Sequence, residues 1–219
     1  MTMTYTGDVT RGGEPAVREL AGLTVTKVSV GPMDNNAYLL KCASDGTQVL
    51  IDAANDAATL LDLIGATGLS TVVTTHRHPD HTGALQEVLK ATGARSIAGA
   101  DDAAEIPVVT DPVNDGDTIT VGDCTLEVIH VVGHTPGSIV LLYREPDGIA
   151  HLWTGDSLFP GGVGNTRGNK KNFASLIGDV ETKLFARLPD DTWFYPGHGK
   201  DSTLGTERPH LPEWRARGW

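Results

Sequence analysis

Residues 75–83, THRHPDHTG, concentrate potential metal ligands in one short segment. Three of the chain's eight histidines and one aspartate fall within residues 76–81. Imidazole nitrogens and carboxylate oxygens are common ligands of zinc, and a catalytic zinc site keeps one coordination position open for water. We therefore expect a metal site at this segment rather than a solvated polar loop.

The spacing of these residues suggests two groups of ligands. His76 and His78 are two residues apart, and on an extended chain such residues point to the same side. Pro79 disfavours the helical conformation at His78 and keeps this stretch extended. The chain is then expected to turn into a helix, which redirects Asp80 and His81. One segment can therefore supply pairs of ligands to two neighbouring points.

Three more potential ligands each follow an apolar, strand-like run and have glycine close by: His134 in GHTPG, Asp156 in TGDS and His198 in PGHG. Glycine lets the backbone approach a site closely, and loops at strand ends often carry binding residues. Together with residues 76–81 they make five histidines and two aspartates, enough ligands for a two-metal centre. The remaining histidines lie in no such motif and are expected to be packed or surface residues: His130, His151 and His210.

Apolar patterning predicts the elements that position these ligands. Strands are expected at residues 24–30, 37–42, 47–53, 70–75, 95–99, 138–143, 149–155 and 192–197, with a hairpin over 117–132. Helices are expected at 56–65, 81–93 and 172–188, with Asp56 capping the first and Gly93 closing the second. Strand-rich stretches with helices between them favour an α/β fold in which two sheets are faced by helices.

No linker interrupts this pattern, so residues 1–219 are expected to form a single domain, with residues 1–22 as a loose, glycine-rich arm. The net charge of −11 disfavours nucleic acid and anionic membranes as partners. No apolar run approaches the ~20 residues that cross a bilayer, and the N-terminus does not resemble a signal peptide. We therefore expect a cytoplasmic protein that acts on a small molecule.

Cys42 and Cys124 form no CxxC pattern and are expected to be small buried residues.

The order of these motifs resembles a known family. HRHPDH, followed by GH at His134, GD at Asp156 and GH at His198, is similar to the motif series of the metallo-β-lactamase superfamily, over about residues 24–205. The resemblance implies a four-layer αββα sandwich with two metal ions at one edge of the sheets. Zinc is the expected metal, although histidine and aspartate ligands also accept iron or manganese.

The resemblance also implies a role for each ligand. The residues expected to hold the first ion are His76, His78 and His134. The residues expected to hold the second ion are Asp80, His81 and His198, with Asp156 bridging the two ions. Asp52, which ends the run VLID, matches the family's aspartate that orients a ligand histidine.

Further segments resemble the glyoxalase II-like hydrolases of this superfamily: DNNAYLL at 34–40, GDSLFPGGVG at 155–164, and YPGHG with TLGTE within 195–207. They imply hydrolysis of a thioester such as S-lactoylglutathione by a hydroxide shared between two metal ions. Asp80, beside that hydroxide, is the expected catalytic residue.

The chain departs from this subgroup at GVGN, residues 162–165, where the subgroup has GCGR, and the sequence does not contain the C-terminal helical region that contacts the thiol carrier in longer members. Substrate contacts are expected instead from residues that could meet a substrate carboxylate: Asn165, Arg167, Lys170 and Lys171.

Three alternative functions fit the same ligands. A persulfide dioxygenase would hold one iron at His76, His134 and Asp156. A lactonase or β-lactamase would use the same fold on a different substrate, and a non-enzymatic module would bind metal without turnover. Metal content, oxygen uptake and a substrate panel distinguish these functions.

Overall fold

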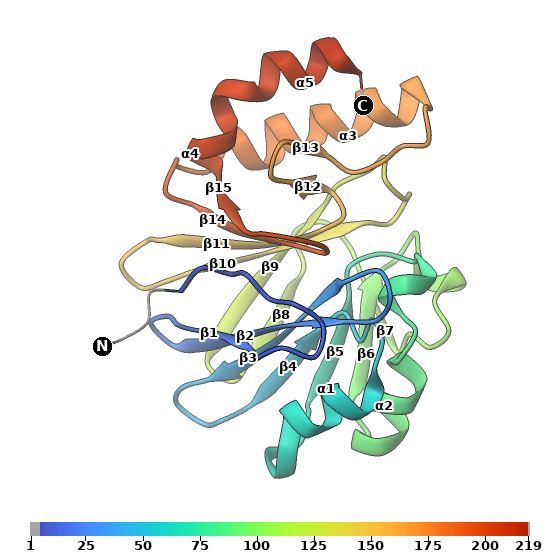
Figure 1. Ribbon diagram of the computed structural model, residues 1–219, viewed down its shortest axis with the longest axis vertical. Helices are drawn as coiled ribbons and strands as arrows, with labels where there is room; N and C mark the ends of the chain where they lie inside the picture. The colour runs from blue at the N-terminus through green and yellow to red at the C-terminus, as the bar shows by residue number, and fades with distance from the viewer. Residues whose placement is uncertain (1–4, 219) are drawn as a thin grey trace.

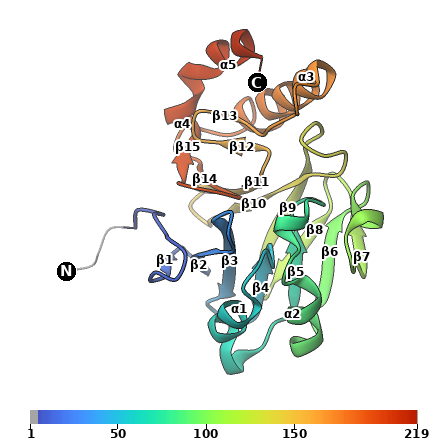
Figure 2. The same ribbon diagram turned by 45° about the vertical axis from the view of Figure 1, so that its right-hand side comes forward.

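A computed structural model describes residues 5–218 and contains two stacked β-sheets with helices on both outer faces (Figure 1). The strand order is β1-β2-β3-β4-β5-β6-β7 in the seven-stranded sheet and β15-β14-β11-β10-β9-β8 in the six-stranded sheet. Helices α1 and α2 cover the first sheet, and α3, α4 and α5 cover the second (Figure 2). The predicted α/β class and αββα layering are confirmed.

The first sheet changes from antiparallel to parallel pairing at β4. Its strands are β1 Ala16–Glu19, β2 Leu23–Val30, β3 Asn35–Cys42, β4 Gln48–Ile51, β5 Thr71–Thr74, β6 Arg95–Gly99 and β7 Asp111–Val113. Parallel neighbours need crossover connections, and α1 (Ala57–Ile64) and α2 (Leu85–Thr92) provide two of them. The 3-10 turn Pro79–His81 precedes α2, so this helix begins later than the sequence predicts.

The second sheet is antiparallel except for the parallel pair of β11 and β14. Its strands are β8 Thr118–Val121, β9 Cys124–His130, β10 Ile139–Arg144, β11 Ala150–Gly155, β14 Trp193–Pro196 and β15 Ser202–Thr203. A small hairpin, β12 (Leu158–Phe159) and β13 (Gly162–Val163), lies beside it. The covering helices are α3 (Lys170–Asp179), which continues as a π-helical segment (Val180–Phe185), α4 (Leu204–Glu207) and α5 (Leu211–Arg217).

Strand β10 is an example of a strand that is buried on both faces of its sheet. Ile139, Leu141 and Tyr143 pack in the core between the sheets, whereas Val140 and Leu142 pack against the covering helices. Successive residues of a strand point to opposite faces, so a strand buried on both faces is a continuous apolar run. Cys42 is also buried between the sheets, with Cys124 packed against the same cluster, and both thiols are free.

The expectation of a loose arm over residues 1–22 is wrong for its described part. Residues 16–19 form β1, which pairs antiparallel with β2. The arm before β1 is held by a buried lysine: Lys27 Nζ donates to Gly7 O at 2.7 Å. Residues 1–4 lie outside the described residues.

The predicted capping role of Asp56 is also wrong. Asp56 occupies the N-cap position of α1, but its side chain makes no capping hydrogen bond. Its carboxylate instead accepts a hydrogen bond from Gly31 N at 2.9 Å and forms an ion pair with Arg11 at 3.0 Å. Among residues 5–218, none of the helices has the length and hydropathy of a membrane-crossing segment.

Candidate metal centre

The seven ligands predicted from the sequence come together at one edge of the sandwich, where strands end and loops begin. They follow β5 (His76 and His78), form the 3-10 turn before α2 (Asp80 and His81), lie in the β9–β10 loop (His134), and follow β11 (Asp156) and β14 (His198). Because β11 and β14 run parallel, their carboxyl ends, and the ligands that follow them, share this edge.

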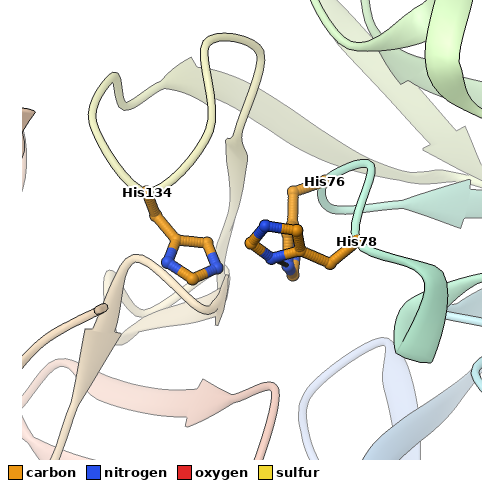
Figure 3. Close-up of side chains that lie close together, drawn as sticks. All are labelled: His76, His78 and His134. Carbon is orange, nitrogen blue, oxygen red and sulfur yellow. Dashed lines mark hydrogen bonds between the residues drawn. The ribbon is translucent and has the colours of Figure 1, made fainter. Parts of the chain in front are cut away.

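Three histidines form the first group, which we call the three-histidine group: His76, His78 and His134. Each offers a ring nitrogen, and these nitrogens lie within 4.8 Å of one another. His76 Nε2 is 3.1 Å from His78 Nδ1, and the rings of His78 and His134 have centroids 4.6 Å apart. Figure 3 shows the three rings close together, His76 and His78 from one loop and His134 from another.

Asp80, His81 and His198 form the second group, with ligand atoms also within 4.8 Å of one another. His198 Nε2 lies 3.3 Å from both His81 Nε2 and Asp80 Oδ2. His81 Nε2 lies 3.5 Å from Asp80 Oδ2. Two imidazoles and one carboxylate thus point at a common centre.

Asp156 lies between the two groups. Its Oδ2 is 3.6 Å from His134 Nε2, in the three-histidine group, and 3.7 Å from His198 Nε2, in the second. Its Oδ1 is 3.4 Å from His81 Nε2. The carboxylate therefore reaches toward both groups, as a bridging ligand must.

The residues at this site fit two divalent cations. His134 Nε2 and Asp156 Oδ1 are buried and find no hydrogen-bond partner among residues 5–218. A buried polar atom without a partner costs free energy, so such atoms are rare in folded proteins. A cation between the facing nitrogens and carboxylate oxygens would satisfy their lone pairs, and imidazole with carboxylate suits zinc or iron.

Hydrogen bonds on the far side of the rings set which nitrogen faces the centre. His134 Nδ1 donates to Asn165 O at 2.9 Å, and His198 Nδ1 donates to Met33 O at 3.0 Å, since a carbonyl can only accept. In each ring the proton is therefore on Nδ1, which leaves the Nε2 lone pair directed at the group.

Asp52 sets the orientation of His81 in the same way. Its Oδ2 lies 2.8 Å from His81 Nδ1, and it also accepts from the hydroxyl of Thr75 at 2.8 Å. Its Oδ1 accepts from Thr75 N at 2.8 Å. Because the Thr75 hydroxyl donates to Asp52, it accepts from His76 Nδ1 at 3.1 Å, so one buried carboxylate supports a histidine of each group.

Electrostatics differ between the two groups. Burial lowers the pKa of His76, His78 and His134, so these rings are neutral and available as ligands near neutral pH. Burial also opposes protonation of His81, but the carboxylates of Asp52 and Asp156 outweigh it and raise the pKa of His81 to about 10. Without metal, His81 is therefore protonated at neutral pH, and a metal ion must displace that proton.

A cavity of about 290 Å³ opens beside the three-histidine group. Of the residues expected to contact substrate, Asn165 and Arg167 line this cavity, together with Arg77. Arg167 is exposed and has a positive φ of 53°, and its backbone N–H donates to Asn165 Oδ1 at 2.7 Å. Lys170 and Lys171 are exposed on the first turn of α3 and do not line the cavity.

The sequence analysis did not identify Asn35 as a residue that contacts a predicted ligand. Asn35 Nδ2 donates to Asp80 Oδ2 at 2.9 Å. Asn35 lies in the DNNAYLL segment that resembles the glyoxalase II-like hydrolases, but nothing in that segment indicates a contact with Asp80.

The three remaining histidines have partners outside the metal centre. His130 lies beside Pro136 O, His151 beside Glu145, and His210 beside Glu213.

Comparison with known proteins identifies the family. Residues 30–198 match the model of the metallo-beta-lactamase superfamily, and the chain belongs to this superfamily. A hydroxyacylglutathione hydrolase of Fuscovulum blasticum is 38% identical over 169 residues, which make up 75% of this chain and 62% of that protein. The chain thus matches less than two thirds of that relative's length.

Two solved structures have the same fold. ETHE1 from Myxococcus xanthus has a TM-score of 0.77 and 27% identity, covering 88% of this chain and 84% of that one. TTHA1623 in a di-iron-bound form has a TM-score of 0.67 and 27% identity, covering 83% of this chain and 96% of that one.

Proposed function

We propose that this chain is a dinuclear metal-dependent hydrolase of small hydroxyacyl thioesters. The observation that carries the proposal is the pair of three-residue ligand groups with the Asp156 carboxylate between them. The relative named hydroxyacylglutathione hydrolase and the di-iron form of TTHA1623 support it. We propose zinc as the metal, with iron and manganese as alternatives, and the cytoplasm as the compartment.

Metal ions bound at the two groups would supply positive charge that polarises a thioester carbonyl and lowers the pKa of water. The chain's own residues then orient the reaction. Burial disfavours the charged form of Asp80, but the hydrogen bond from Asn35 and the positive charge of His81 act together to outweigh it and lower the pKa of Asp80. Asp80 is therefore ionised at neutral pH, and its carboxylate can accept a hydrogen bond from the attacking water and direct it toward the carbonyl.

We propose that the cavity beside the three-histidine group receives part of the substrate. The Arg167 guanidinium and the Asn165 side chain would bind a substrate carboxylate there. Lys170 and Lys171, exposed at the start of α3, would add positive charge near its mouth. A thioester substrate would have to place its carbonyl at the metal centre, and this cavity lies directly beside the three-histidine group.

Thiol release from a substrate panel tests the proposal. The metal-loaded protein is incubated with S-lactoylglutathione and an acyl-coenzyme A, and the released thiol is followed with a chromogenic reagent. A lactone and a β-lactam are tested in parallel, and the opening of their rings is followed by the acid that it forms. We expect thioester cleavage that stops with a chelator and returns with added metal. Absence of cleavage of every thioester would refute the proposal.

The alternative of a persulfide dioxygenase is tested in the same preparation. That reaction would use one iron held by His76, His134 and Asp156, so it predicts one iron per chain and oxygen uptake with glutathione persulfide. The proposed hydrolase predicts two metal ions per chain and no oxygen uptake.

A further inference from the structure

Asp102 is a buried carboxylate beside the metal centre that is not one of its ligands. It precedes the 3-10 turn Ala103–Glu105, after β6, and its exposed fraction is 0%. A buried carboxylate must find hydrogen-bond donors, because burial without them is costly. The donors to Asp102 come from the two loops that carry His76, His78 and His134.

Asp102 joins the two loops that carry the three histidines. Its Oδ2 accepts from the backbone N–H of Arg77 at 3.0 Å, and Arg77 lies between His76 and His78. The same oxygen accepts from the hydroxyl of Thr135, the residue after His134, at 2.6 Å.

The other carboxylate oxygen adds to this connection. Asp102 Oδ1 accepts from Gly137 N at 2.9 Å, and the Arg77 side chain lies 3.7 Å from it. The packing is close, because a Cβ atom on Gly137 would lie 2.2 Å from Asp102 N. The β9–β10 loop is therefore held against the turn that contains Asp102.

We propose that Asp102 is a positioning residue that sets the spacing of the three-histidine group by tying the His76–His78 segment to the His134 loop. The inference rests on the proposed function, since it assumes that this group binds a metal ion. Metal ligation depends strongly on ligand spacing, and partners behind the ligands commonly change metal affinity 10- to 100-fold.

The chemistry of Asp102 explains why an amide cannot replace it. An asparagine has one acceptor oxygen and one NH2 donor of the same shape. With its oxygen toward Arg77 N and the Thr135 hydroxyl, its NH2 would face the N–H of Gly137. With its oxygen toward Gly137, its NH2 would face the N–H of Arg77. Either orientation leaves a buried backbone N–H without an acceptor.

The second group is supported by other residues. Asp52 orients His81, and Lys27 Nζ donates to Gly199 O at 2.8 Å, next to His198. Of these residues, none is a partner of Asp102. We therefore expect Asp102→Asn to weaken one of the two metal equivalents and to leave the other nearly unchanged.

Zinc binding to metal-free protein, in competition with a chromophoric chelator, tests this inference. In Asp102→Asn, we expect the affinity of one equivalent to fall about tenfold or more and that of the other to stay within about threefold. The variants His78→Ala and His198→Ala show which zinc equivalent binds at which group, because each removes a predicted ligand of only one group.

Glu207→Gln is the matched control. Glu207 is also a buried carboxylate, which accepts from Gly161 N at 2.9 Å and the Ser202 hydroxyl at 2.7 Å, and neither donor is adjacent to a ligand. We expect both equivalents of Glu207→Gln to bind zinc within about threefold of wild type. The inference is overturned if Asp102→Asn binds both equivalents normally, or weakens both by the same factor.

If Asp102→Asn does not fold, Thr135→Val decides the question. It removes one donor to Asp102 and preserves the shape of the side chain. Selective weakening of the equivalent assigned to the three-histidine group supports the inference, and unchanged binding overturns it. A wild-type chain that binds two zinc ions without cleaving thioesters contradicts the proposed function but not this role of Asp102.

Discussion

Replacing Asp52 by asparagine should move the proton of His81 to the wrong nitrogen. Asp52 is 2% exposed, so water cannot rearrange freely around it. An asparagine oxygen must stay opposite the N–H of Thr75, which only donates. The NH2 group then faces His81 Nδ1 and donates to it. That bond requires the ring proton on Nε2, the nitrogen that lies 3.4 Å from Asp156 and points into the second group.

The expected loss follows from the three contacts of Asp52, each 2.8 Å long. Loss of a carboxylate that orients a ligand histidine typically costs 10- to 100-fold in metal affinity, or about 1.4–2.7 kcal/mol. The hydrogen bond to Thr75 N survives, so the fold should be retained. The loss should therefore appear in turnover and in metal binding rather than in thermal unfolding. It should affect the second group through His81 and the three-histidine group through Thr75 and His76.

Zinc titration of metal-free Asp52→Asn against a chelator measures this effect. Asp62→Asn, on the exposed face of α1, is the control and should bind like wild type. Wild-type affinity of Asp52→Asn for both zinc ions, in a folded protein, would refute the assigned tautomer and the orienting role of Asp52.

Three further predictions concern the site and the fold. Asp156→Ala should abolish thioester turnover, whereas His210→Ala should leave it unchanged; near-normal turnover of Asp156→Ala would contradict the bridging assignment. Since the pKa of His81 is about 10, metal and proton compete, and zinc affinity at the second group should rise as pH increases from 6 toward 9; a flat profile in titrations would contradict this. Trp214 is a residue of α5, is 1% exposed and packs in the core between this helix and the second sheet. Trp214→Ala should therefore lower the free energy of unfolding, measured in urea, by about 3–5 kcal/mol. A loss below about 1 kcal/mol would contradict this packing.

The features predicted well from the sequence are those that depend on neighbouring residues. The segment His76–His81 carries four of the seven side chains that converge in the structure, and the remaining three each follow an apolar strand. Strand ends put side chains at a sheet edge, so short motifs were enough to indicate the site. The apolar runs of β4 and β10 likewise indicated strands, and the structure shows that both are largely buried.

The features that sequence analysis missed depend on distant contacts. Asp102 lies in the ordinary polar stretch ADDAAE, and only the fold brings Arg77 and Thr135 to it. Asp56 has the residue type of a helix cap, but its ion pair with Arg11 prevails over the cap. The polar segment of residues 5–22 lacks apolar periodicity, and its order depends on pairing with β2 and on the buried Lys27.

Anomalous X-ray scattering from a crystal of the zinc-loaded protein tests the central claim most directly. The account predicts two zinc peaks about 3.5–4 Å apart, with Asp156 between them. One peak should lie within bonding distance of the three-histidine group and the other of Asp80, His81 and His198. A single peak, or two peaks that do not share Asp156, would contradict the dinuclear centre.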